Sequence, residues 1–227
     1  GGYSPRRPDE LITQRFHRLA LTDRISGKWA YHGTVLDGDE RLLWGNHGVP
    51  RFVEFGTNEF LYQCYGDGMQ IYRQRGELFR LAAMVGGHEP GPDGCFNHKL
   101  SKDEQKPVGL WSWTDQNDDG RIATNEVVWF QAPGKARYAV FGMNADAKGS
   151  LIYCDHHTHA IWELPMARLN AGGNPVYDWS LVREIVPRDT SRAKFDPLMA
   201  VRSDDGSLYA MGRSDAWDRP GGKEAGW

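Results

Sequence analysis

The stretch "GTNEFLYQCYGDGMQIYRQRGELFRLAAMVGG", residues 56–87, indicates most clearly how this chain folds. It holds three runs rich in aromatic and aliphatic residues, "FLYQCY", "MQIYRQ" and "ELFRLAAMV". The runs are separated by Gly66-Asp67-Gly68 and by Arg75-Gly76, and such residues form the tight turns of hairpins. The stretch therefore predicts an antiparallel meander of three strands.

The composition of the whole chain agrees with this pattern. The 227 residues are enough for one large all-β domain or two small domains. There are 27 glycines and nine each of Trp, Tyr and Phe, which favours many short strands joined by tight turns. Helical signals are few: residues 8–21 could form one or two helical turns, and residues 163–169 could form another, which Pro165 limits to a first turn. We expect an all-β fold.

Charge and hydropathy argue against nucleic-acid binding and against a membrane span. The net charge of −3 argues against a nucleic-acid surface, which usually carries a basic stripe. No run of about 18 apolar residues is present, so the sequence predicts no membrane span. The chain begins at "GGYSPRRPDE" without Met and stops at "RPGGKEAGW", so we expect a piece of something longer, and the missing signal peptide does not argue against export.

The spacing of the three cysteines does not indicate a metal site or a haem site. Cys64, Cys95 and Cys154 form no C-x-x-C pair, so a zinc knuckle or an attached haem has no support. At most one disulfide can form. The commonest role of such cysteines is that of small buried apolar residues.

Similar phrases recur along the chain, and they suggest repeated sheets. "FLYQCYGDGMQIYR" is similar to "GLWSWTDQNDDGRI", "SLIYCDHHTHAIWEL" and "SLYAMGRSDAWDR" when the four are aligned on Leu61, Leu110, Leu151 and Leu208. A period of roughly 40–50 residues with several strands per unit is typical of β-propeller blades. With "KWAYHGTVLDGDERLLWG" at 28–45, we expect four or five four-stranded antiparallel blades, forming one propeller domain over residues 1–227 or a fragment of a larger one. The alternative is an ordinary β-sandwich.

The stretch "WSWTDQNDDGRIATNEVVWF", residues 111–130, contains a calcium-loop pattern. Residues 115–126 match D-x-[DN]-x-[DN]-G-x5-E at every fixed position, and Gly120 allows the sharp turn inside it. Calcium prefers about 6–8 oxygen ligands, which side chains and one carbonyl of this loop can supply. The predicted calcium ligands are Asp115, Asn117, Asp119, the carbonyl of Arg121, and Glu126.

This loop has two other interpretations. An acidic turn without an ion would contain the same residue types, although agreement at five spaced positions favours calcium. A signalling pair of EF-hands is excluded, because the chain holds one such loop and Trp111 and Trp113 before it have strand spacing. We therefore expect a single EF-hand-like loop inserted in place of a hairpin turn.

A second cluster, "YCDHHTHAIW" at residues 153–162, is rich in histidine. His157 and His159 alternate along the chain and would share one side of a strand, with His156 beside them. Such imidazoles suit zinc, iron or copper, or a general base. The alternative is a polar hairpin turn, and a metal would need a further ligand such as His88 or His98.

Other residues suggest binding surfaces. The polar loop at 86–100 carries Glu89, Asp93 and His98, and it is either a binding loop or a connector. Exposed tryptophans stack on sugars, although blade cores also contain them; the candidates are Trp44, Trp129 and Trp179. No G-x-S-x-G, P-loop or H-E-x-x-H pattern occurs.

The phrases "DGMQIYRQRGELFRLAAMVG", "LWSWTDQNDDGRIATNEV" and "AIWELPMARLNAGGNPVYDW" resemble a group of large exported bacterial β-propeller proteins with NHL-like blades. Members of that group carry an EF-hand-type calcium loop inserted in a blade, like residues 113–126 here. The resemblance covers most of residues 50–190 and implies a propeller, bound calcium and an extracellular or periplasmic location. It implies no established reaction.

These observations lead to three hypotheses about function. The first is a calcium-stabilised, non-catalytic binding module that takes a glycan or a protein partner. The second is a metal-dependent lyase or hydrolase that uses the His156–His159 cluster. The third is a structural subunit of a larger assembly, or a part of a longer chain.

Overall fold

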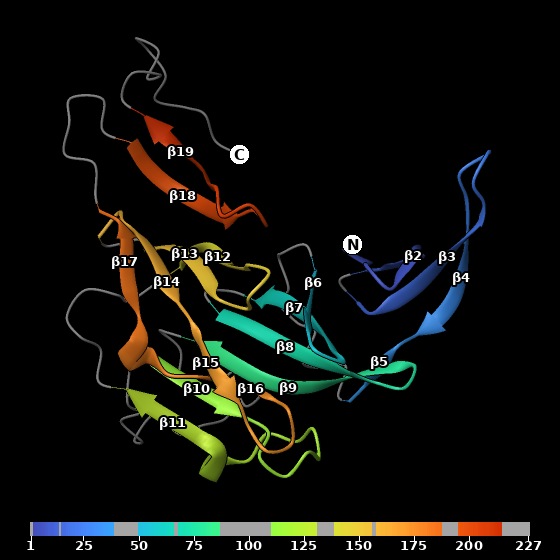
Figure 1. Cartoon of the computed structure of the whole chain (residues 1–227), viewed down its shortest axis with the longest axis horizontal. Helices are drawn as coiled ribbons and strands as arrows, with labels where there is room; N and C mark the ends of the chain where they lie inside the picture. Colours follow the sequence, from blue (N-terminus) through green and yellow to red (C-terminus); the bar gives the residue numbers. More distant parts are fainter. Residues whose placement is uncertain are drawn as a thin grey trace, which may run out of the picture.

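The computed structural model describes residues 2–13, 15–38, 50–65, 68–86, 110–130, 139–155, 158–187 and 195–214. Within these ranges the chain is all-β, as the sequence predicts (Figure 1). The two described helices are three-residue 3-10 turns, η2 (Thr124–Glu126) and η3 (Trp179–Leu181). No described helix therefore has the length and apolar character that a membrane span requires.

The N-terminal sheet has four antiparallel strands in chain order. They are β1 (Gly2–Ser4), β2 (Arg7–Ile12), β3 (His17–Asp23) and β4 (Lys28–Thr34). The helical turns expected over residues 8–21 are wrong, because Leu11 pairs with Leu19 across β2 and β3. Between these two strands, Phe16 has φ of 57°, which lies in the left-handed region. A residue in this conformation can continue neither a strand nor a right-handed helix.

The central sheet has seven strands, six of which form a meander in chain order. They are β6 (Arg51–Phe55), β7 (Asn58–Tyr65), β8 (Gly68–Arg75), β9 (Leu78–Gly86), β10 (Leu110–Thr114) and β11 (Val127–Phe130). The seventh, β5 (Leu36–Asp37), pairs in parallel with the start of β9. Strands β7, β8 and β9 confirm the three-stranded meander predicted from residues 56–87.

A four-stranded antiparallel sheet and two hairpins complete the fold. This sheet, called the β12–β17 sheet below, has the order β12 (Ala139–Ala145), β13 (Leu151–Asp155), β14 (Ile161–Leu164), β17 (Arg183–Val186). The hairpins are β15 (Met166–Leu169) with β16 (Pro175–Tyr177), and β18 (Phe195–Arg202) with β19 (Leu208–Ser214). The helical turn expected over 163–169 is also wrong: Leu164 pairs with Leu151, and β15 begins just after Pro165.

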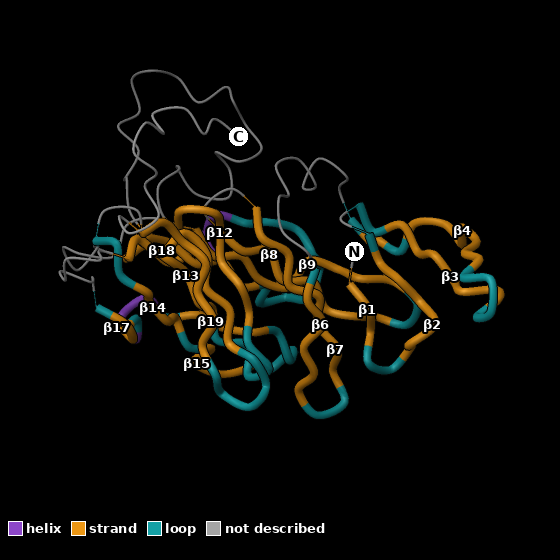
Figure 2. The backbone as a smooth tube through the Cα atoms, turned by 90° about the horizontal axis from the view of Figure 1, so that it is seen from above, coloured by secondary structure: helices purple, strands orange, loops and turns teal. Residues whose placement is uncertain are grey.

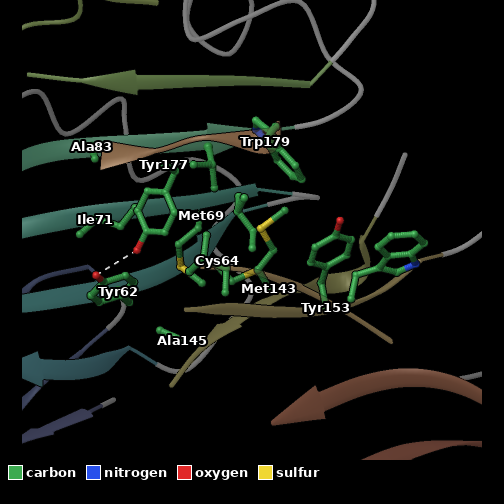
Figure 3. Packing of buried hydrophobic residues seen from close by; sticks show 14 of the residues in the cluster. Tyr62, Cys64, Met69, Ile71, Ala83, Met143, Ala145, Tyr153, Tyr177 and Trp179 are labelled. Carbon is green, nitrogen blue, oxygen red and sulfur yellow. Dashed lines mark hydrogen bonds between the residues drawn. The ribbon is translucent and has the colours of Figure 1, made fainter. Parts of the chain in front are cut away.

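The central sheet packs face to face with the β12–β17 sheet, whereas the N-terminal sheet contacts the central sheet through few of its residues. One face of the central sheet, with Tyr62, Met69 and Ile71, packs against Met143 and Tyr153 of the β12–β17 sheet (Figure 3). The opposite face of the central sheet contacts the N-terminal sheet in a second buried cluster, which includes Ile12, Phe16, Leu61, Tyr72, Met84, Trp111 and Trp113. A third cluster joins the far side of the β12–β17 sheet to the β18–β19 hairpin and includes Ile152, Cys154, Ile161 and Ala200. Both inner sheets are thus covered on two faces.

The N-terminal sheet lies to one side of the central sheet, and the β18–β19 hairpin lies beyond the β12–β17 sheet (Figure 1). Strands β3 and β4 extend away from the rest of the described chain (Figure 2). The repeated phrases do not mark one sheet each: Leu61 and Leu110 lie in β7 and β10 of the same central sheet. Leu151 and Leu208 begin β13 and β19.

The cysteines behave as the sequence predicts where they are described. Cys64 and Cys154 are buried thiols within the apolar clusters. Burial, with a smaller effect of the Asp196 charge, raises the pKa of Cys154 to about 12. Such a thiol stays protonated and unreactive at neutral pH. Cys95 lies outside the described residues.

Candidate metal centre

The predicted calcium loop, residues 115–126, connects β10 to β11 of the central sheet. It therefore stands where a hairpin turn would otherwise join two neighbouring strands. At its start, the Asp115 N–H donates to the Ala82 carbonyl at 3.0 Å. At its end, Ile122 and Val127 pack against the buried cluster of the central sheet. The framework thus fixes both ends of the loop.

Side chains at alternate positions converge on the loop backbone. The Asp119 N–H lies 3.2 Å from both Asp115 Oδ1 and Asn117 Oδ1. The Gly120 N–H donates to Asp115 Oδ2 at 2.7 Å, and the Arg121 N–H donates to Asp119 Oδ1 at 2.7 Å. Asn117 Nδ2 donates to Asp119 Oδ2 at 2.9 Å. Three of the predicted ligand side chains are therefore held together in one tight turn.

Glu126, the last predicted ligand, is directed back toward the start of the loop. Its Oε1 accepts from the Gln116 N–H at 2.9 Å, and its Oε2 accepts from Trp113 Nε1 at 3.0 Å. Both oxygens are therefore fixed, and the carboxylate is buried. The indole comes from β10, so the strand itself positions the residue that closes the loop.

The electrostatics of the loop favour a cation. Burial raises the pKa of Asp115, and the charge of Glu126 adds to this effect, although backbone N–H groups such as that of Gly120 oppose it. The raised pKa means that the negative charge on Asp115 is disfavoured where it stands. A divalent cation held by these oxygens would reverse that penalty.

Arginines outside the loop neutralise a different carboxylate. Arg75 forms a two-oxygen contact with Asp118, and Arg80 donates to the Asp118 carbonyl at 3.0 Å. Burial alone would raise the pKa of Asp118, but Arg75 outweighs it and the pKa is lowered. In the described part of the chain the predicted ligands Asp115, Asp119 and Glu126 form no ion pair. The arginines therefore form their ion pairs outside the calcium pattern, although the charge of Arg80 also acts on Asp115.

Two asparagines outside the loop donate hydrogen bonds to its backbone. Asn170 Nδ2 and Asn174 Nδ2 each donate to the Asp115 carbonyl at 2.9 Å. Both belong to the turn between β15 and β16, which is also joined to β10 by the hydrogen bond from Thr114 Oγ1 to the Pro175 carbonyl at 3.1 Å. Sequence reasoning missed this support, because "NAGGN" indicates a turn without indicating what it contacts.

Gly120 supplies the backbone conformation that the loop requires. Its φ of 70° lies in the left-handed region, as the loop pattern predicts. A Cβ here would also lie 2.6 Å from Cγ of Arg80, whose guanidinium is held by Asp37 and by the Asp118 carbonyl.

We expect Gly120→Ala to lower the free energy of unfolding by about 2–3 kcal/mol, from backbone strain and overpacking together. Urea denaturation measures this change. Gly76→Ala is the matched control, because Gly76 has φ of 61° and open space around its Cβ. That control should show strain alone, about 1–2 kcal/mol. Equal losses in the two variants would contradict the close contact with Arg80.

The donor set fits calcium in its chemistry, since carboxylate, amide and carbonyl oxygens are the ligands that this hard cation prefers. Across the described ranges, no three His, Cys, Asp or Glu side chains already lie in a group able to hold a metal ion. The loop as described is held by its own hydrogen bonds. Calcium binding by residues 115–126 therefore stays a prediction.

The histidine cluster is described only in part. His156 and His157 lie outside the described residues, as do His88 and His98. His159 has φ of 53°, and its Nδ1 contacts a carboxylate oxygen of Asp196 on β18. This contact links the β13–β14 turn to the neighbouring hairpin. A second metal or base at this cluster also stays a prediction.

The tryptophans and loop residues that the sequence offers as binding residues differ in exposure. Trp179 is buried and donates from Nε1 to the Trp111 carbonyl at 2.9 Å, so it belongs to the core. Trp129 on β11 is 40 % exposed. Trp44 and the loop residues Glu89 and Asp93 lie outside the described residues.

Comparison with known proteins gives no match: no family model, curated protein or solved structure is similar to this chain at a significant level. The resemblance to exported bacterial β-propeller proteins therefore stays a hypothesis.

Proposed function

We propose that this chain is a calcium-stabilised, non-catalytic binding module with a β-propeller plan, exported to an extracellular or periplasmic location and binding a glycan or protein partner. The observation that carries the proposal is the loop at residues 115–126. Its acidic residues occupy the positions that the calcium pattern requires, Asp115 and Glu126 are buried, and Asp115 accepts hydrogen bonds from the backbone of the loop.

The propeller plan draws support from the order of packing. The central sheet packs face to face with the β12–β17 sheet, and each of the two buries apolar residues on its other face as well. A two-layer β-sandwich buries one face of each sheet, whereas stacked blades bury both. Antiparallel four-stranded sheets at two levels of the stack fit blades as well.

Export draws support from the type of ion site. Extracellular modules use calcium sites with Kd of roughly 10⁻⁴–10⁻³ M, which are filled only where calcium is abundant. The ion would hold the loop in shape and join the ends of β10 and β11. A structural ion of this kind leaves ligand binding to the sheet faces and the long loops.

Elemental analysis and calorimetric titration of the purified chain test the proposal. We expect one calcium ion per chain and loss of binding in Asp115→Ala. The control is Asp205→Ala, which removes a turn-forming aspartate from the β18–β19 hairpin. Bound zinc, iron or copper without any response to calcium would overturn the proposal in favour of the histidine cluster.

The enzyme hypothesis has one observation of its own. A carboxylate that holds one nitrogen of an imidazole fixes its orientation, as in sites where histidine acts as a base. The contact between Asp196 and His159 has this arrangement. If it is catalytic, His159→Ala should abolish turnover of a hydrolase or lyase substrate while the melting temperature is kept.

A further inference from the structure

Two segments share one edge of β9. Strand β8 pairs with the other edge along almost the whole length of β9. On the shared edge, β5 pairs with the start of β9, where Asp37 lies opposite Arg80, and β10 pairs with the second half. Between these pairings, the N–H of Asp115, the first residue of the calcium loop, donates to the Ala82 carbonyl at 3.0 Å. The calcium loop therefore begins beside the end of β5.

Arg80, in β9, contacts both of these segments. Its Nε donates to Asp37 Oδ2 at 2.8 Å, and its Nη2 lies 2.6 Å from the same oxygen. Its Nη1 donates to the Asp118 carbonyl, within the calcium loop, at 3.0 Å. The aliphatic part of the side chain is also constrained, because a Cβ on Gly120 would lie 2.6 Å from its Cγ. One arginine side chain therefore links β5 to the calcium loop.

The segment that contains β5 also attaches the N-terminal sheet to the central sheet. The Val35 N–H donates to the Phe16 carbonyl at 2.8 Å, and the Val35 carbonyl accepts from the Phe79 N–H at 2.7 Å. Among the described residues up to β4, Ile12 and Phe16 alone belong to the apolar cluster shared with the central sheet, and arginine ion pairs add to this contact. A part of the fold with so few buried contacts opens at a lower free energy than the core.

We propose that the calcium loop controls how firmly the N-terminal sheet is attached, and that Arg80 transmits this control. In the ordered loop, the Asp118 carbonyl holds Arg80 where its guanidinium binds Asp37, and β5 stays paired with β9. An open loop removes that carbonyl, so β5 detaches more readily. The inference rests on the proposed function in one respect, because it takes calcium as the ion that orders the loop. The contacts that carry it are present without the ion.

Apolar packing adds to the link through Arg80. Leu36 of β5 and Ile122 of the calcium loop both pack against the buried cluster that includes Phe79. The effect must also act in both directions, because two linked equilibria change each other by the same factor. Calcium should therefore slow the opening of β5, and an attached β5 should strengthen calcium binding. Linked sites typically change each other by about 5-fold or more.

Hydrogen exchange of the full chain with calcium and with EGTA tests the proposal. Saturating calcium should slow exchange at the Val35 and Phe79 amides by about 5-fold or more, relative to amides of β13. Arg80→Met should remove this response. Arg168→Met, which removes an exposed arginine from β15, is the matched control and should keep it. Calorimetric titration of Arg80→Met shows whether calcium still binds, which separates loss of the ion from loss of the transmitted effect.

A second variant tests the link without calcium. Gly120→Ala crowds Arg80 from the side of the loop, so in EGTA it should speed exchange at Val35 and Phe79 more than in β13. The control is Gly206→Ala in the β18–β19 turn, where φ is also positive, at 88°, and the space around a Cβ is open. It should leave the ratio of these exchange rates unchanged.

The outcomes separate this inference from the proposed function. Bound calcium without slower exchange at Val35 would overturn the inference, as would a calcium response that Arg80→Met retains. Equal exchange ratios in Gly120→Ala and Gly206→Ala would overturn the link through Arg80 itself. A chain that binds no calcium but shows the Gly120→Ala effect would refute calcium as the controlling ion, and with it the proposed function, while confirming the link.

Discussion

Calcium at about 100 times its Kd is expected to raise the free energy of unfolding by about 2.7 kcal/mol, and the Asp115→Ala variant is expected to lose most of this gain. The reason is that the folded loop holds its predicted ligand residues at fixed positions, whereas the unfolded chain does not. Asp115 accepts from the Gly120 N–H at 2.7 Å and stands under the influence of the Glu126 charge. A cation bound there stabilises the folded state alone.

Thermal melting with calcium and with EGTA measures the effect. The wild-type chain should melt at a higher temperature with calcium, and Asp115→Ala should melt at nearly the same temperature in both. Asp205→Ala is the matched control: it loses a hydrogen bond of 2.8 Å from the Ser207 N–H but should keep the full response to calcium. Equal melting of the wild-type chain in the two buffers would refute calcium binding by the loop.

The second large effect is expected at Arg202, which joins the β18–β19 hairpin to the β12–β17 sheet. Its Nη1 lies 3.1 Å from Oδ2 of Asp146 and 3.0 Å from Oε1 of Glu163. Both carboxylates are buried. Without Arg202, Asp146 loses its arginine partner and Glu163 keeps Arg183 alone. Arg202→Met should therefore cost about 2–3 kcal/mol, somewhat less than the loss of a fully buried pair.

This contribution depends on pH in a defined direction. Burial alone would raise the pKa of Glu163, but the hydrogen bonds and charges of Arg202 and Arg183 outweigh it and hold the pKa below its ordinary value of 4.5. A carboxyl whose pKa is lowered by folding stabilises the protein fully above its ordinary pKa. That stabilisation is lost as the pH falls through the lowered value. The wild-type chain should therefore lose stability below pH 4.5 more steeply than Arg202→Met.

Urea denaturation at neutral pH and at about pH 3.5 checks both parts of this prediction. Arg168→Met, which removes an exposed arginine from β15, is the control and should change stability by less than about 0.5 kcal/mol. If Arg202→Met and the control were equally stable at neutral pH, the ion pairs would contribute nothing and the prediction would be wrong.

The sequence was most informative where the decisive contacts are local. The hairpins of β7, β8 and β9 followed from turn residues and strand composition, because neighbouring strands pair in chain order. It misled over residues 8–21, where the apolar positions fit a short helix as well as two strands. The pairing of Leu11 with Leu19 and the left-handed backbone of Phe16 show that two strands form. Neither feature can be inferred from the spacing of apolar residues in the sequence.

The same distinction holds at the candidate site. The ligand side chains lie within twelve consecutive residues, so their spacing alone predicts the turn, and the left-handed φ of Gly120 confirms its geometry. The residues that contact the loop come from distant segments. Arg75 is the last residue of β8 and Arg80 lies in β9, whereas Asn170 and Asn174 lie in the turn between β15 and β16. No local pattern relates such residues, because sheet packing alone brings them to the loop.

The two amide donors on the Asp115 carbonyl make the calcium loop a junction rather than an isolated turn. The loop belongs to the central sheet, and the donors belong to the turn between β15 and β16. Arg73 of β8 contacts that same turn at the Gly172 carbonyl and at Asn174. We therefore expect the two segments to unfold together, because opening either one breaks hydrogen bonds that the other makes.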